Sequence, residues 1–440
     1  MRRQEANPNP TPAPTPKQVR HGLCGGKKLT LLGQSFGGFC ILTYLSLFPA
    51  AIERALFTFG LAPVGRSATE VYGATYLRMQ ERNRRFYEHC YGRTYHGPTY
   101  HRPTCHGPTY YGRSVTAAFT SATRRTWSSC VRSSRACTRH PSPCLLPCPS
   151  YHAPLTMPIT TNQAPLAMPR GGTLTPRRFL MLGLLLGSAN GFESLHDLLE
   201  MAREMPQLQP TGGGDGGGGG AGGGGAGAGG GRQLPDNFLL AVEQAQQHFE
   251  TNPLYWLLHE SIYCDANAKD PAARGPSGWA AEKVQASLGD EWQYASNLEA
   301  GAPPVQLTGE MVYSWMAEDF AWLRSLKPAA EILAAKSDWG PLYDPAVLGG
   351  GKTGEGGEGL NAGPDSGPNA GPSAGPPVAA LVSYEDVYVE RAFSEATAKL
   401  LGGRARLWVT NEFQHSGLRD DPTVFERLLA MSKGEVAIPS

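Results

Sequence analysis

The chain has 440 residues, of which 39 are basic and 38 acidic, so its formal net charge is +1. Apolar residues make up 40% of the chain and charged residues 18%, which is enough for a packed core and excludes a wholly disordered, collagen-like or coiled-coil protein. Glycine and proline contribute 55 and 37 residues and occur in clusters, so the length that can fold is well below 440 residues.

The charge is divided unequally along the chain. Residues 1–170 carry 21 Lys and Arg against 5 Asp and Glu, whereas residues 171–440 carry 18 against 33. Such asymmetry can indicate nucleic-acid binding. Here the basic excess lies largely in a low-complexity run without a folded scaffold, so we expect no nucleic-acid partner.

Signals for membrane insertion and secretion are weak. The longest apolar stretch, residues 179–187, has nine residues, about half of the roughly 20 that a bilayer requires. The N-terminus lacks the apolar region of a secretory signal, and nine cysteines in a chain of this length do not form a small-domain disulfide framework. We expect a cytoplasmic protein without a membrane partner; organellar import and the oligomeric state stay open.

Composition divides the chain into segments that can fold and segments that cannot. Low apolar content and Gly, Pro or Arg enrichment predict a disordered tail, a low-complexity insertion and two linkers. These are residues 1–19, 89–170, 212–231 and 349–377. The remaining segments are 20–88, an α/β core with the start of a helical domain, 171–348, which is predicted to be helical, and 378–440, the C-terminal part of the core.

Strands and helices alternate in the first and last of these segments. The first contains predicted strands at 28–32 and 54–59 around a helix at 39–48, and the last contains strands at 378–383 and 406–410 around a helix at 394–401. This alternation predicts a parallel sheet and the α/β class. The middle segment carries helical patterns at 175–186, 192–205, 237–249, 280–288, 309–326 and 329–335.

A Gly-x-Ser-x-Gly motif, Gly33-Gln-Ser35-Phe-Gly37, lies directly between a predicted strand and a predicted helix. In this context the motif forms a sharp turn that exposes a nucleophilic serine, here Ser35. We expect Gly33 and Gly37 to lack side chains because strand and helix approach each other there. The N–H of Phe36, at the start of the helix, is positioned to stabilise an oxyanion.

A serine hydroxyl needs a base and a group that orients the base. In the fold that carries this turn the order along the chain is Ser, then Asp or Glu, then His. Asp386 follows the strand at 378–383, with Glu385 and Glu390 as neighbouring alternatives, and His415 follows the strand at 406–410. The sequence therefore predicts a Ser35, Asp386 and His415 triad.

Several collinear stretches, among them GQSFGGFCILTYLSLFP, EVYGATYLRMQERNRRFY and WVTNEFQHSGLR, resemble the bacterial-type proline iminopeptidases. These are serine peptidases of the α/β-hydrolase superfamily with an inserted helical cap domain. The resemblance implies release of proline from peptides with a free N-terminal proline, by Ser35, Asp386 and His415. It also implies that cap glutamates bind the substrate's ammonium group; Glu260 matches best and Glu310 is the second candidate. The triad and the oxyanion site supply this chemistry, so no cofactor is expected.

The start of the chain departs from this family. Only 27 residues precede the first predicted strand, and the HGGPG-type loop that supplies a second oxyanion N–H does not occur. We therefore expect a partial α/β-hydrolase fold, built from the C-terminal strands of the sheet and lacking the N-terminal third, with reduced or absent activity. Two alternatives stay open: an esterase or amidase acting on small acyl groups, and a catalytically inactive remnant.

Patterns that imitate metal sites are weak. His259-Glu260 begins an HExxH motif, but position 263 is Tyr. A group of cysteines and histidines lacks the paired spacing of zinc knuckles: Cys130, Cys137, His140, Cys144, Cys148 and His152. No metal site is predicted.

Overall fold

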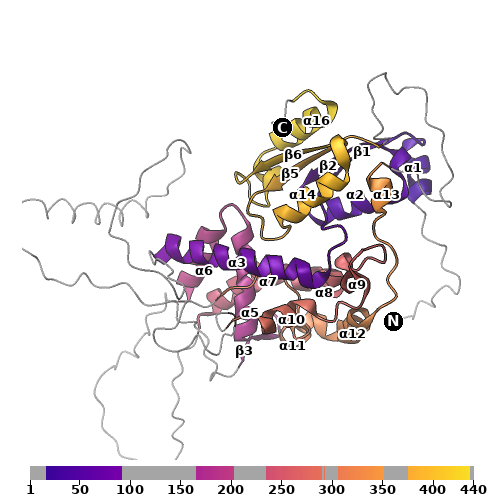
Figure 1. Ribbon diagram of the computed structural model, residues 1–440. Helices are drawn as coiled ribbons and strands as arrows, with labels where there is room; N and C mark the ends of the chain where they lie inside the picture. The colour runs from indigo at the N-terminus through magenta and orange to yellow at the C-terminus, as the bar shows by residue number, and fades with distance from the viewer. Residues whose placement is uncertain are drawn as a thin grey trace, which may run out of the picture. The chain divides into compact units, whose positions relative to one another are not determined.

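A computed structural model of the chain describes residues 16–91, 165–202, 234–289, 292, 306–350 and 375–436 (Figure 1). All of these belong to one compact unit, made of Met1–Arg93 and Thr156–Ser440. The predicted linker at 212–231, most of the predicted insertion at 89–170, most of the linker at 349–377 and the cysteines and histidines at 130–152 lie outside the described residues.

Four parallel strands form the main sheet of the described residues, in the order β1-β2-β5-β6. They are β1 (Leu29–Gln34), β2 (Ile52–Thr58), β5 (Val378–Ser383) and β6 (Ala405–Thr410). Each overlaps a strand predicted from a short apolar run, and the parallel α/β arrangement is confirmed. Strand β5 is buried along its whole length, as expected for an inner strand covered on both faces.

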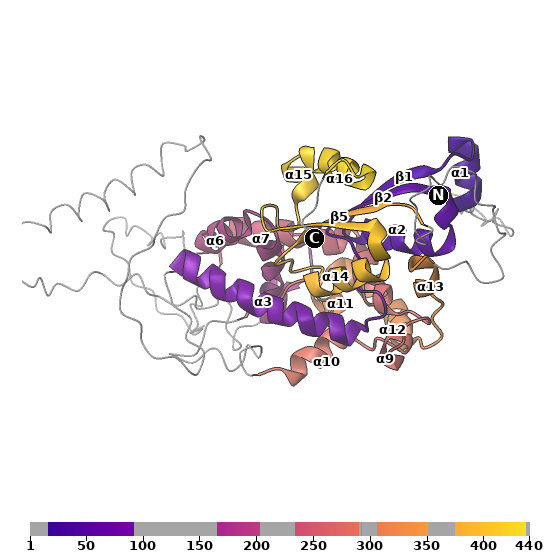
Figure 2. The ribbon, with the colours of Figure 1, turned by 45° about the horizontal axis from the view of Figure 1, so that its top comes forward.

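Helices cover both faces of this sheet (Figures 1 and 2). One face is covered by α2 (Phe36–Leu47) and α14 (Arg391–Leu400), and the other by α16 (Thr423–Lys433). Under α16, the side chains of Leu56, Ala379 and Leu381 pack with those of Val424, Leu428 and Met431. Burying a leucine-sized side chain contributes about 1.5–3 kcal/mol, so this layer fixes the strands that end at the site.

Helices and turns make up most of the described chain between β2 and β5. In order they are α3 (Ala68–Tyr91), β3 (Leu166–Ala167), β4 (Thr173–Leu174), α5 (Pro176–Leu180), η2 (Met181–Gly187), α6 (Gly191–Met201), α7 (Asp236–Thr251), α8 (Pro253–Leu258), η3 (Glu260–Tyr263), α9 (Pro271–Arg274), α10 (Ala280–Ser287), α11 (Met316–Asp319), η6 (Ala321–Leu326), α12 (Lys327–Ala335) and α13 (Pro345–Leu348).

Three features of this region differ from the prediction. The helix predicted at 309–326 is wrong in its first half, where residues 306–315 form no helix and only α11 and η6 follow. The helix predicted at 175–186 changes after Leu180 into the 3₁₀ helix η2, and β3 and β4 form an antiparallel hairpin in a segment predicted to be wholly helical. Helix α3, with 24 residues, was not among the predicted helices.

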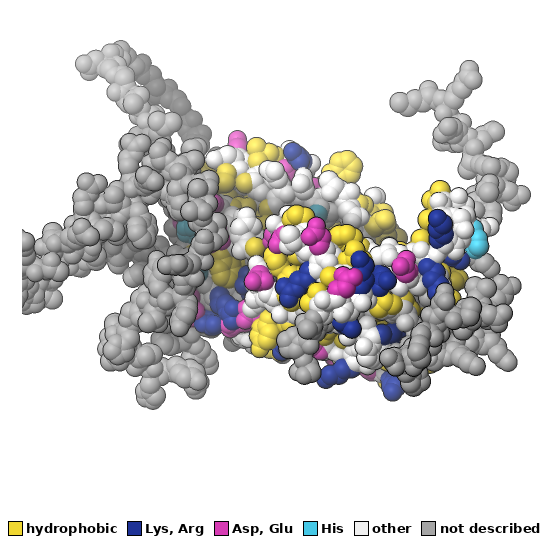
Figure 3. Space-filling view, turned by 90° about the horizontal axis from the view of Figure 1, so that it is seen from above, with side chains coloured by type: hydrophobic (Ala, Val, Ile, Leu, Met, Phe, Trp, Pro, Cys, Tyr) yellow, Lys and Arg dark blue, Asp and Glu magenta, His cyan; other side chains and the backbone are white. Residues whose placement is uncertain are grey.

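The remaining elements flank the sheet. They are α1 (Pro16–Cys24), η1 (Pro49–Ala51), η7 (Gly402–Arg404) and α15 (Gly417–Asp420). Because α1 begins at residue 16, the predicted disordered tail of residues 1–19 is wrong for its last four residues. No helix within the described ranges is both long and apolar enough to cross a membrane. On the face shown in Figure 3, basic and acidic side chains are interspersed rather than gathered by sign.

Candidate active site

Ser35 lies in a strained turn between β1 and α2. Its φ of 53° and ψ of −126° fall outside the regions that L-residues ordinarily adopt, at a cost of about 1–3 kcal/mol. The turn is held because the Ser35 N–H donates to the Thr58 carbonyl at 2.9 Å, while its own carbonyl accepts from the Gly38 N–H at 2.8 Å. Such strain persists only where the surroundings enforce it, and it marks Ser35 as a functional candidate.

Glycines allow the strand and the helix to meet at this turn. A Cβ on Gly33 would lie 2.6 Å from the Gly37 backbone, and one on Gly38 would lie 2.2 Å from the Gly60 carbonyl oxygen. A Cβ on Gly37 would meet nothing within 4 Å. The expectation that Gly37 must lack a side chain is therefore wrong; Gly38, which stacks on the end of β2, carries that constraint.

Asp386 and His415 form a hydrogen-bonded pair at the carboxyl ends of β5 and β6. The Nδ1 atom of His415 lies 2.8 Å from Oδ2 of Asp386. The other carboxylate oxygen, Oδ1, accepts the N–H groups of Tyr388 at 2.8 Å and Val389 at 3.2 Å, which fixes the orientation of the carboxylate. Asp386 is buried.

The neighbouring carboxylates point elsewhere. Glu385 is bound by Arg85, and Glu390 by Arg78, both from α3. Asp386 is thus the carboxylate of this loop that contacts the imidazole.

Side-chain contacts join the Ser35 turn to the His415 loop. Gln34, the residue before Ser35, donates from Nε2 to the His415 carbonyl at 3.3 Å. The ring of Phe59 lies 5.3 Å from the imidazole, and the next residue, Gly60, packs against the Ser35 carbonyl. Within the described residues no hydrogen bond links the Ser35 hydroxyl to His415, and in ligand-free sites such bonds are often long until substrate is bound.

The environment of His415 favours its protonated form. Burial by itself would lower the pKa of the imidazole, but the charge and the hydrogen bond of Asp386, with a smaller contribution from Glu310, raise it above its usual value. The ring of Tyr388 packs on the imidazole at a centroid distance of 4.4 Å. These contacts suit a group that must accept a proton and hold the resulting charge.

Glu310 lies within electrostatic reach of this pair. The pKa of its carboxyl is raised to about 7, mainly by withdrawal from bulk water and to a smaller extent by Asp386, while His415 and a hydrogen bond from Tyr255 act in the opposite direction. The Tyr255 hydroxyl donates to Oε1 at 2.8 Å. Within the described residues Glu310 forms no ion pair with a lysine or arginine, and a carboxylate partly withdrawn from water in this way is suited to bind a cationic ligand.

Glu260 has a different environment. It is buried, and its Oε2 accepts the N–H of Trp279 at 3.0 Å while Oε1 accepts that of Ala281 at 3.5 Å. Burial raises the pKa of this carboxyl, against hydrogen bonds from Ser277 and from the backbone at the start of α10. Glu260 therefore caps the N-terminus of α10, a role that its sequence context did not predict.

Aromatic side chains surround the two glutamates. Tyr72 and Tyr263 pack edge to face at 6.1 Å, and Tyr255 lies 4.9 Å from the ring of His259. The buried hydroxyl of Tyr72 has no hydrogen-bond partner within the described residues. Sequence reasoning missed Gln34, Tyr255 and Tyr388; the last is two residues after Asp386, which is the one signal that could have found it. No cluster of metal-binding side chains occurs among the described residues.

The chain is 33% identical over 416 residues to a proline iminopeptidase of Aeromonas sobria, an alignment that covers 94% of this chain and 69% of that protein. The chain belongs to the proline iminopeptidase family. It is also 29% identical over 177 residues to a proline iminopeptidase of Aspergillus aculeatus, covering 40% of this chain and 31% of that protein. No family model matches the chain.

Family membership confirms the resemblance drawn from the sequence. The expectation that the N-terminal third of the family fold is missing is not borne out by these alignments.

Proposed function

We propose that this chain is a serine aminopeptidase that releases proline from the N-terminus of peptides. The observation that carries the proposal is the 2.8 Å contact between His415 and Asp386 at the same sheet edge as the strained Ser35, with Glu310 beside the pair. Membership of the proline iminopeptidase family supports the same reaction.

In the proposed mechanism Ser35 Oγ attacks the carbonyl carbon of the N-terminal proline while Nε2 of His415 accepts the hydroxyl proton. The negative charge that develops on the carbonyl oxygen is stabilised by the N–H of Phe36, because the first N–H groups of a helix have no acceptor within it. As the C–N bond breaks, His415 returns the proton to the departing amine. Water then cleaves the prolyl ester on Ser35 with His415 again acting as base, and Asp386 holds the tautomer in both steps.

Substrate selection is proposed to rest on the charge of the N-terminal proline. Its secondary ammonium group would bind Glu310, which accepts a hydrogen bond from Tyr255 and forms no ion pair with a lysine or arginine among the described residues. Glu260 is proposed as a second, weaker contributor, since its carboxylate already accepts hydrogen bonds from Ser277 and from the backbone at the start of α10. An internal proline, whose nitrogen is an uncharged amide, would leave these carboxylates unpaired.

The domain organisation is part of the proposal. The sheet with α2, α14 and α16 would be the core of an α/β-hydrolase fold, and the helical segments at 171–348 would be the inserted cap that carries both glutamates. Such a cap places the ammonium-binding groups over the carboxyl ends of the strands, where open α/β sheets bind their ligands.

Hydrolysis of a prolyl-arylamide, compared with its N-acetylated form, tests the proposal. We expect the free amine to be cleaved and the acetylated compound to be cleaved poorly, with activity lost in Ser35→Ala. Preference for the acetylated substrate would instead indicate an esterase or amidase. Failure of a fluorophosphonate probe to label Ser35 in folded protein would indicate a catalytically inactive chain.

A further inference from the structure

Helix α3 presents three rows of side chains, each spaced three or four residues apart and so each on its own face of the helix. The first row faces the segment that carries Glu310 and the second faces the loop that carries Asp386. The third pairs within the helix itself, where Glu81 also accepts a hydrogen bond from Arg85 of the second row. One helix thus touches both halves of the candidate site.

The first row consists of Tyr76, Met79 and Asn83, all buried. The Asn83 side chain holds the backbone of Leu307 in both directions: Nδ2 donates to its carbonyl at 2.8 Å, and Oδ1 accepts its N–H at 2.9 Å. The Tyr76 hydroxyl lies 2.9 Å from that of Tyr313.

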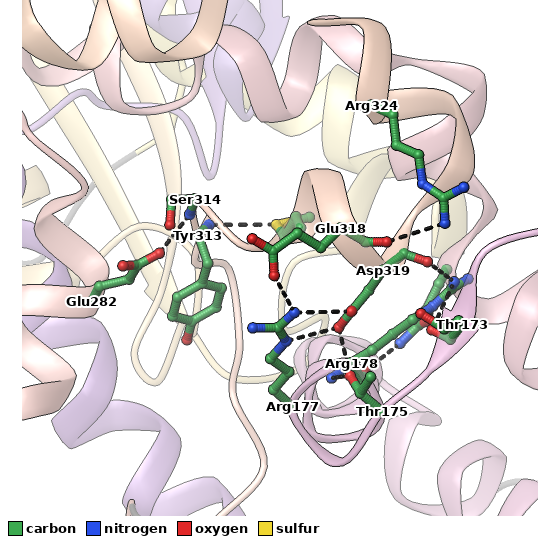
Figure 4. Close-up of polar contacts among 12 residues, drawn as sticks. Thr173, Thr175, Arg177, Arg178, Glu282, Tyr313, Ser314, Glu318, Asp319 and Arg324 are labelled. Carbon is green, nitrogen blue, oxygen red and sulfur yellow. Dashed lines mark hydrogen bonds and ion pairs between the residues drawn. The ribbon is translucent and has the colours of Figure 1, made fainter. Parts of the chain in front are cut away.

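Between these two anchors lies Glu310. A Cβ on the preceding residue, Gly309, would meet the Met79 sulfur at 2.7 Å. The segment around Glu310 thus packs closely on α3 and is hydrogen-bonded to it at residues 307 and 313. On its far side, Glu282 accepts the Ser314 N–H, and Arg177 pairs with Glu318 and Asp319, so the chain after Glu310 is also fixed away from α3 (Figure 4).

The second row consists of Arg78, Arg82 and Arg85. Arg85 binds Glu385 through two parallel hydrogen bonds, at 2.5 and 2.6 Å, and Arg78 binds both oxygens of Glu390 at 3.0 and 3.1 Å. Bidentate arginine–carboxylate pairs fix geometry as well as charge.

These two pairs flank Asp386, which follows Glu385 directly. Between them Arg82 donates to the Leu186 carbonyl at 2.7 and 3.1 Å, and Tyr388, which packs on His415, donates to the Leu184 carbonyl at 2.8 Å. The second row therefore braces the loop that orients the imidazole.

We propose that α3 is a positioning element that fixes the separation between the ammonium-binding carboxylate Glu310 and the Asp386–His415 pair. This inference rests on the proposed aminopeptidase function, because that reaction requires a set distance between the substrate's charged nitrogen and its scissile carbonyl. A misplacement of about 1 Å at a reacting centre can cost about 100-fold in rate, so a stiff helix in contact with both sites has a direct effect on turnover. Asn83, Tyr76, Arg78 and Arg85 act through other residues and are not themselves catalytic.

The two rows make separable predictions. Tyr76→Phe and Asn83→Ala should raise KM for the prolyl-arylamide about tenfold while kcat changes less than about threefold. These variants should displace the Glu310 carboxylate but leave the Asp386–His415 pair in place. Arg85→Gln should lower kcat about tenfold or more with little change in KM. Arg85→Lys, which keeps the charge, should recover part of kcat, and the exchange Arg85→Glu with Glu385→Arg should recover more than either single change.

The matched control is Arg84→Gln in the third row, because Arg84 pairs with Glu81 and Glu88 on α3 itself. An NMR titration of the His415 imidazole gives a readout independent of activity. His415 faces Asp386, Glu310, Arg419 and Tyr388, and loosening Asp386 in Arg85→Gln should lower the imidazole pKa relative to Arg84→Gln.

The inference is overturned if Arg85→Gln matches Arg84→Gln in both kcat and imidazole titration, or if both rows alter kcat and KM alike. If the wild-type protein does not cleave the prolyl-arylamide, the proposed function fails, and the imidazole titration still tests the position of Asp386. Thermal unfolding checks that each variant is folded. If Asn83→Ala does not fold, Tyr76→Phe, which removes only one oxygen atom, tests the first row.

Discussion

Glu310 has surroundings that suit a cationic ligand, and its removal tests substrate selection at the level of one residue. In Glu310→Gln the substrate ammonium loses its charged partner, a loss that typically costs about 2–5 kcal/mol. We expect kcat/KM for the prolyl-arylamide to fall about 30-fold or more, with a much smaller change for the N-acetylated compound. Steady-state kinetics measure the ratio of kcat/KM for the prolyl-arylamide to kcat/KM for the N-acetylated compound.

A surface glutamate provides the control for this variant. Glu395 pairs with Arg391 on α14, so Glu395→Gln changes the same atoms away from the site. If the ratio of kcat/KM for the two substrates is unchanged in Glu310→Gln, another group recognises the ammonium.

The pKa of Glu310 predicts a pH dependence. Because this carboxyl titrates at about 7, it is neutral below that pH and binds a cation only above it. The raised pKa of His415 acts in the same direction, since the base must be unprotonated. We therefore expect kcat/KM for the prolyl-arylamide to fall as the pH drops from 8 to 6.

Glu310→Gln should simplify that profile. The limb due to Glu310 disappears, and the limb due to His415 moves to lower pH because a neighbouring negative charge is gone. Profiles of kcat/KM report groups of the free enzyme, which is the state these contacts describe. Superimposable profiles of the two proteins would contradict this assignment.

At the scale of an element, the two adjacent glycines Gly37 and Gly38, in the turn after β1, differ in whether they can accept a side chain. Gly38→Ala places a methyl group 2.2 Å from the Gly60 carbonyl, a clash of backbone that should destabilise the protein by about 3 kcal/mol or more. Gly37→Ala meets nothing within 4 Å and should be neutral or stabilise by up to about 1 kcal/mol. Thermal unfolding of the two variants measures the difference, and equal midpoints would refute it.

Elements differ in how far the sequence predicts them. The four strands could be predicted because short apolar runs bounded by Gly, Pro and charged residues have few other structures available. Helix α3 could not, because its buried row alternates with a row of arginines that bind other segments and with a row of Arg and Glu that pair on the helix itself. The segment at 309–315 reads as helical, but the Ser314 N–H donates to Glu282 and the Tyr313 carbonyl accepts from Trp256, so tertiary contacts override its helical propensity.

At the scale of the whole molecule, the site joins residues that are hundreds of positions apart. The placement of Ser35, Asp386 and His415 at one edge of the sheet was predictable because each follows a strand, and the carboxyl ends of parallel strands share one edge. The capping of α10 by Glu260 and the contacts of Tyr255 with Glu310 were not, since they depend on how helices pack rather than on local pattern.

The low-complexity segments also matter for the whole molecule, because they lie in the sequence between the segments that carry the site residues. Helices α6 and α7 pack against each other, and the Gly-rich run at 212–231 lies in the chain between them. Removal of that run leaves residues 203–211 and 232–233 to connect the helices, a reach of about 35 Å at roughly 3.3 Å per residue. This exceeds the length of either helix at about 1.5 Å per residue, so the packing of α6 on α7 can be kept.

We therefore expect deletion of 212–231 to leave kcat/KM for the prolyl-arylamide within about twofold. The thermal midpoint should be unchanged or slightly higher, because shortening the connection between the helices from 31 to 11 residues returns only about 0.9 kcal/mol of closure entropy. Deleting 306–315 provides the contrast, since that segment carries Glu310 and its anchors to α3, and should abolish activity. A large loss of activity on removing the glycines, in protein that unfolds at the wild-type temperature, would assign the run a role in the reaction that its composition does not indicate.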